Sequence, residues 1–67
     1  MEGGEDLKLT LKEWRRAKGC SITKLANSLD VSFSTIMRWE ENAEKMPIGK
    51  VVDACEVLGI RLDDILF

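Results

Sequence analysis

The sequence VSFSTIMRWEEN, residues 31–42, has the pattern of a short helix that packs through one face. Ser32 is suited to cap the start of this helix, and Ile36, Trp39 and Glu40 fall on one side at helical spacing. The other sides carry a mixture of polar and large apolar side chains, namely Phe33, Ser34, Met37 and Arg38. We therefore expect a helix over about residues 32–41 with an outer side that is available to a partner.

A second helical pattern lies directly before this stretch, over about residues 21–29, with Ser21 as its cap. Its apolar stripe consists of Leu25, Ala26 and Leu29. Asp30 follows the stripe, and aspartate tolerates the left-handed backbone conformation better than most residues. A turn this short makes the two helices meet at a steep angle, as in a helix-turn-helix, and leaves one face of the later helix outside the core.

Capping signals predict one more helix before this pair and another after it. Thr10 and Glu13 form a capping box at the start of a first helix, and Gly19 is suited to end it. Pro47 opens a fourth helix, where a missing N–H costs nothing, and Gly59 ends it. The apolar stripe of this fourth helix consists of Val51, Ala54, Cys55 and Leu58.

A fifth short helix is expected to begin near Arg61, because Leu62, Ile65 and Leu66 repeat at helical spacing. The sequence shows no strand-like alternation. We therefore predict an all-α domain over residues 7–67, a compact bundle of five short helices. Residues 1–6, which are polar, acidic and rich in glycine, are predicted to be disordered.

Composition argues against an enzyme and against a metal site. The 67-residue chain has no histidine and only two cysteines, so it lacks both zinc-ligand spacing and a Ser/His or Cys/His nucleophile pair. Asp63 and Asp64 are adjacent, so their carboxylates do not face each other on a helix. Cys20 and Cys55 fit reduced core positions. With no signal peptide and no membrane-spanning segment expected, we predict a cytoplasmic non-enzyme without cofactor or metal.

The charge is unevenly distributed along the chain, although the net charge of −2 argues weakly against a nucleic-acid partner. Residues 11–52 carry eight basic and five acidic side chains, whereas both ends are acidic. The basic residues available for phosphate contacts are Lys18, Lys24, Arg38, Lys45 and Lys50. The middle of the chain therefore carries a small excess of positive charge, which is suited to a polyanionic partner.

Residues 9–47, LTLKEWRRAKGCSITKLANSLDVSFSTIMRWEENAEKMP, together with VVDACEVLGIRLDDILF at residues 51–67, resemble the Cro/cI-type (XRE) helix-turn-helix family. They are most similar to short regulators of phages, prophages and mobile elements. The resemblance implies a lambda-repressor-like fold and sequence-specific binding of double-stranded DNA. It also implies a homodimer on a palindromic operator and a role in transcription control, as a repressor-like regulator.

The resemblance also implies roles for individual residues. Base-facing positions are occupied by Phe33, Ser34, Met37 and Arg38. Positions that touch the DNA backbone are occupied by Ile22, Lys24, Ser32, Thr35 and Lys45. Arg15 and Glu40 occupy positions of an ion pair that ties the first helix to the third. Separately, the apolar end formed by Ile65, Leu66 and Phe67 is our expected dimer interface, because its apolar content exceeds the needs of a last helical turn.

Several residues depart from a typical DNA reader and support a second hypothesis. Ile22 stands where the family commonly has a glutamine that holds a phosphate, and Glu41 and Glu44 would repel one. Phe33 is suited to a thymine methyl group, to a protein partner, or to packing against Met37 one turn away. The alternative is a helix-turn-helix fold reused as a protein–protein interaction module with little or no DNA binding.

Overall fold

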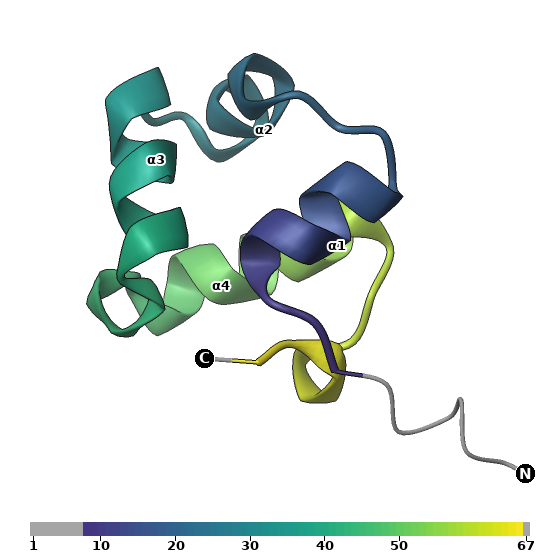
Figure 1. Ribbon diagram of the computed structural model, residues 1–67. Helices are drawn as coiled ribbons and strands as arrows, with labels where there is room; N and C mark the ends of the chain where they lie inside the picture. The colour runs from purple at the N-terminus through teal and green to yellow at the C-terminus, as the bar shows by residue number, and fades with distance from the viewer. Residues whose placement is uncertain (1–7, 67) are drawn as a thin grey trace, which may run out of the picture.

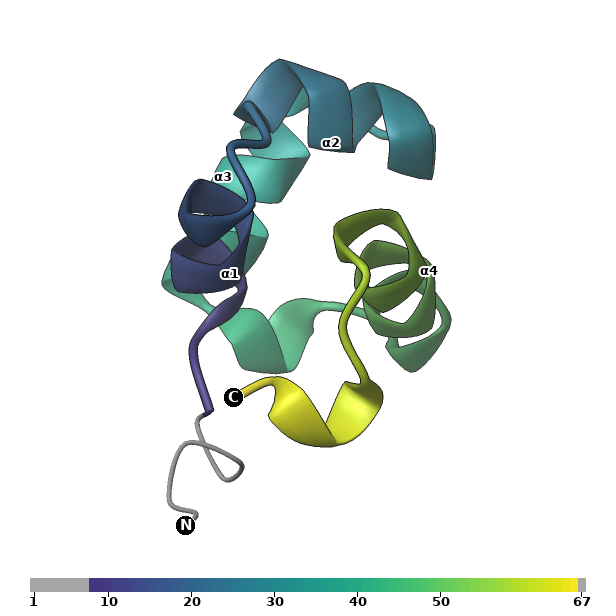
Figure 2. The same cartoon turned by 90° about the vertical axis from the view of Figure 1, so that its right-hand side faces the viewer.

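The computed structural model describes residues 8–66, so both the N-terminal segment predicted to be disordered and Phe67 lie outside it. Four α-helices follow one another as α1 (Leu11–Ala17), α2 (Ile22–Leu29), α3 (Phe33–Glu41) and α4 (Ile48–Leu58). Two single 3₁₀ turns complete the order, η2 (Ala43–Lys45) and η3 (Leu62–Asp64). Figure 1 shows α3 turning steeply away from α2, and Figure 2 shows α4 across the core from α1 and α3. The described part of the chain contains no β-strand.

The ends of the helices are determined by capping, as the sequence predicted. Thr10 and Glu13 form the predicted capping box at α1. The side chains of Ser21 and Ser32 accept hydrogen bonds from backbone N–H groups three residues further on, at 3.0 and 3.2 Å. Asp30 adopts the left-handed conformation at φ 60° and so makes the sharp turn between α2 and α3.

The core is formed by the apolar stripes of the helices. The fully buried side chains include Leu25 and Leu29 of α2, Ile36 of α3 and Val51 of α4. The predicted stripes of α2 and α4 are buried, and so are the apolar residues of the inner face of α3, because helical spacing sets which side chains point inward. Lys50 of α4 adds a polar tie by donating to the carbonyl of Leu29 at 2.8 Å.

The prediction of a fifth helix is wrong, because residues 62–64 form only the 3₁₀ turn η3. The backbone beyond this turn is engaged by the start of the chain instead. Leu9 and Ile65 form an isolated parallel β-bridge, in which Leu66 N–H donates to the Leu9 carbonyl at 2.8 Å. The Trp14 indole N–H also donates to the carbonyl of Asp64, at 2.7 Å. A helix through Ile65 would remove these bonds, so the chain stays extended there.

Candidate nucleic-acid interface

The outer side of α3 presents two parallel strips of different chemistry. Phe33 and Met37, one turn apart, are 50% and 44% exposed. Ser34 and Arg38, each one residue further along, are also exposed and form a polar strip beside the apolar one. The four residues that the sequence assigned to base contacts therefore lie together on the solvent side of one helix.

Hydroxyl groups gather at the start of α3. Ser32 Oγ lies 2.8 Å from Thr35 Oγ1 and 3.2 Å from Ser34 Oγ, in addition to capping the helix. The free N–H groups of a first helical turn carry partial positive charge and attract anions. This end of the helix therefore combines several hydrogen-bonding groups in a small area. Ser34, assigned only to base contact from the sequence, thus also has a hydrogen-bond partner in Ser32.

The orientation of α3 is fixed by an ion pair between Arg15 and Glu40, away from its exposed side. Arg15 Nε donates to Glu40 Oε2 at 2.6 Å, and its Nη1 donates to the carbonyl of Cys20 at 2.9 Å. The two side chains are only 10% and 5% exposed. The pair that the resemblance implied thus links α1, the loop before α2, and α3, which fixes how the outer face of α3 is presented.

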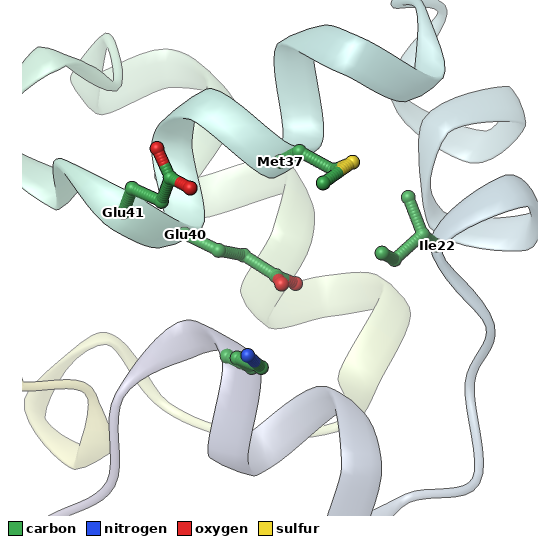
Figure 3. Close-up of a pocket in the computed structure, with 5 residues that line it drawn as sticks. Ile22, Met37, Glu40 and Glu41 are labelled. Atoms are coloured by element: carbon green, nitrogen blue, oxygen red, sulfur yellow. The ribbon is translucent and has the colours of Figure 1, made fainter.

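A small open pocket of about 110 Å³ lies where α1, α2 and α3 meet. Its lining consists of Lys12, Ile22, Met37, Glu40 and Glu41. Figure 3 shows Ile22 and Met37 pointing toward each other across the pocket, with Glu41 turned away from them. Ile22 is half-buried and packs against the core, which accounts for an apolar residue at this position. Sequence reasoning had missed Lys12, because its approach to α3 depends on the packing of α1.

The acidic residues at the end of α3 and just after it leave its cation, Arg38, without an ion pair within residues 8–66. Arg38 has no ion pair with Glu41 or Glu44, since the ion pairs formed within residues 8–66 are Arg15–Glu40 and Arg61–Asp63. Lys24, Arg38 and Lys45 are exposed, without a carboxylate partner in this range. Two other candidate cations have structural contacts instead: Lys50 binds the Leu29 carbonyl, and Lys18 lies 5.8 Å from the centre of the Trp14 ring.

The residues predicted to form the dimer interface differ in burial, since Ile65 is buried and Leu66 is exposed. Ile65 is only 6% exposed and belongs to the core of its own chain, because the bridge to Leu9 draws it inward. Leu66 is 49% exposed, and Leu62 of η3 is 43% exposed. Phe67 lies outside the described residues. An apolar surface therefore remains at this end, without Ile65.

Neither a metal cluster nor a membrane span is found in the part of the chain that the structure describes. Residues 8–66 bring together no group of three or more side chains of the His, Cys, Asp or Glu type. None of the helices in this range has the length and apolar character needed to cross a bilayer.

Two short helices joined by a tight turn, with the outer face of the second exposed, define a helix-turn-helix domain. A model of the helix-turn-helix family matches residues 11–65, and the chain belongs to this family. It is a family of DNA-binding regulatory domains rather than of enzymes. The match confirms the XRE-type helix-turn-helix resemblance of the sequence, whereas similarity to phage regulators stays a prediction. No curated protein and no solved structure matches the chain.

Proposed function

We propose that the chain is a sequence-specific regulator of transcription that inserts α3 into the major groove of double-stranded DNA. The observation that carries the proposal is the exposed polar strip of α3, formed by Ser34 and Arg38, in which Arg38 pairs with no carboxylate of residues 8–66. An arginine in the groove donates two hydrogen bonds to guanine O6 and N7, worth about 1–3 kcal/mol of discrimination.

Contacts to the DNA backbone would position the helix. Ser32 and Thr35 lie at the start of α3, and the first-turn N–H groups of α2 at Ile22 add donors that need no polar side chain. Lys24 and Lys45 are exposed cations suited to phosphate. In this proposal Ile22 contributes through its backbone, which is why its apolar side chain is tolerated.

The finer features of the proposal follow from the resemblance. A domain of this size reads few base pairs, so we expect a homodimer on a palindromic operator. The exposed Leu62 and Leu66, together with Phe67, form the dimer interface of this proposal. We also propose a repressor-like role of the phage or mobile-element type.

A second candidate function is a protein-interaction module, and it is favoured by a specific observation. Phe33 and Met37 expose large apolar surfaces on the same helix that carries Glu41. Exposed apolar clusters often mark interfaces between proteins. Such a module would show no appreciable binding to duplex DNA even at low salt.

Selection of bound duplexes from a random pool at low salt separates the two functions. Enrichment of a palindrome supports a dimeric DNA reader and gives its half-site spacing. Affinity for the enriched site should fall as salt rises, and Lys45→Ala should lower the slope by about 1 per protomer. Arg38→Ala should relax specificity at one base pair with the fold intact. A pool that stays random at low salt would overturn the proposal.

A further inference from the structure

The apolar strip of α3 continues across the helix-turn-helix into α2. Phe33 and Met37 are neighbours one turn apart, and Met37 faces Ile22 across the open pocket (Figure 3). Neither side chain is buried, because about half of each remains exposed. Among the described residues, this apolar surface is thus only partly covered.

The surroundings of this apolar surface match DNA better than they match an apolar protein partner. Exposed Ser34 and Arg38 run alongside it, and the hydroxyl group of Ser32 lies at its N-terminal end. Glu41 limits the strip at its C-terminal end. The exposed cation of Arg38, in the last turn of α3, and hydrogen-bond donors nearer its start therefore border the apolar strip, which begins with Phe33 at the N-terminal part of the helix. In a helix-turn-helix, this is the part of the second helix that reaches base edges.

The major groove offers one apolar group at base edges, the C5 methyl of thymine. We propose that Phe33 and Met37 read thymine methyl groups, so that the site is specified partly by methyl contacts beside the polar contacts of Ser34 and Arg38. This inference rests on the proposed DNA-binding function. It makes the two residues determinants of specificity rather than structural residues of the fold.

Helix geometry sets the spacing of the methyl groups. Four residues of α-helix rise about 6 Å, whereas base pairs in B-DNA are about 3.4 Å apart along the axis. Phe33 and Met37 would therefore reach positions about two base steps apart if α3 follows the groove. The polar strip, offset by one residue, would read the positions between and beside them.

Replacement of thymine by uracil tests the inference, because uracil lacks only the C5 methyl group and keeps the same pairing. Each thymine of the selected site is replaced in turn, and affinity is measured at fixed low salt. We expect two positions per half-site, one for each side chain, at which the wild-type protein loses about fourfold in affinity, the loss for about one buried methyl group. The other thymines should be insensitive.

Variants assign each methyl group to its side chain. Phe33→Ala should weaken binding to the thymine site and abolish the uracil effect at one position, and Met37→Ala should do so at another. Val57→Ala is the matched control, because Val57 is 40% exposed and lies on α4. It should keep the full uracil effect at both positions. Both test residues are on the surface, so thermal unfolding should show that their variants remain folded.

The outcomes of the two tests are distinguishable. An enriched site at which uracil is tolerated everywhere overturns methyl reading and leaves DNA binding intact. A uracil effect that survives in both alanine variants also overturns it. If no duplex is enriched, the proposed function fails and methyl reading fails with it.

Discussion

Replacing Glu40 with glutamine should destabilise the domain strongly, because it removes the charge that compensates Arg15. The change keeps the shape of the side chain and one hydrogen-bond acceptor. The Arg15 side chain is only 10% exposed, however, and its Nε lies 2.6 Å from the Glu40 carboxylate. Glu40→Gln would therefore leave a guanidinium charge nearly buried without an opposite charge beside it.

The expected loss is large compared with the stability of so small a domain. Breaking a buried ion pair by removing one partner costs about 3–5 kcal/mol, and glutamine should fall near the lower value because it still accepts a hydrogen bond. Stability of about 0.05–0.15 kcal/mol per residue gives a chain of this length roughly 3–10 kcal/mol in total. A loss of about 3 kcal/mol would lower the midpoint of thermal unfolding by at least about 12 °C.

The double variant Arg15→Met, Glu40→Met provides the decisive comparison. It removes both charges. The main remaining cost to stability comes from the Cys20 carbonyl, which loses its hydrogen-bond donor, Arg15 Nη1, now 2.9 Å away. An unsatisfied buried acceptor costs about 1–3 kcal/mol. We therefore expect the double variant to be more stable than the sum of the losses in Arg15→Met alone and Glu40→Met alone predicts.

Urea unfolding followed by circular dichroism measures the free energies of all these variants. Asp63→Asn is the control, because Asp63 pairs with Arg61 on the surface at 82% and 81% exposure, and exposed pairs contribute little. A loss below about 1 kcal/mol for Glu40→Gln, or strictly additive losses in the double variant, would refute the reasoning.

Three further predictions concern stability. Ser32→Ala should cost about 1 kcal/mol in urea unfolding, because the N-cap hydrogen bond of α3 is lost. Trp14→Phe should also cost about 1 kcal/mol, because the bond from its indole N–H to the Asp64 carbonyl disappears. Burial, and secondarily the Asp64 carboxylate, raises the pKa of the Cys55 thiol above its ordinary 9.0. The folded state therefore holds the thiol proton more tightly, and its contribution to stability, complete below pH 9, should be lost as pH rises through the folded-state pKa. Cys55→Ala should flatten this decline above pH 9, and a decline that persists unchanged would contradict the assignment.

Features of the fold that depend on near neighbours in the sequence could be predicted from it. The caps of α1, α2 and α3 each involve residues only three positions apart, so a short window of sequence contains both partners. The buried stripes followed from helical spacing in the same way. The fifth helix failed because Leu9 competes for the backbone at Ile65, and a helical pattern at residues 62–66 carries no sign of a residue so far away in sequence.

The candidate site likewise has features that follow from the local sequence and features that depend on residues far away in sequence. The α3 side chains that face solvent could be predicted from helical periodicity, because burial of Ile36 and Trp39 determines which residues point outward. The pocket that joins Lys12 to Met37 could not be predicted, since it depends on how α1 packs beside α3. The apolar content of the last residues likewise suggested Ile65 for a dimer interface, whereas its burial accompanies a bridge to Leu9, far away in sequence.

The apolar side chains of α3 alter what kind of DNA reader the domain can be. Arg38 offers the main exposed cation of this helix, and Glu41 follows it within one turn. Few phosphates can then be neutralised near α3, so non-specific binding driven by release of counterions should be weak. A larger share of the affinity for a correct site would come from base contacts, including methyl contacts through Phe33 and Met37. Because burial of apolar surface is screened little by salt, a site rich in suitably spaced thymines should retain more of its affinity as salt rises than random duplex does.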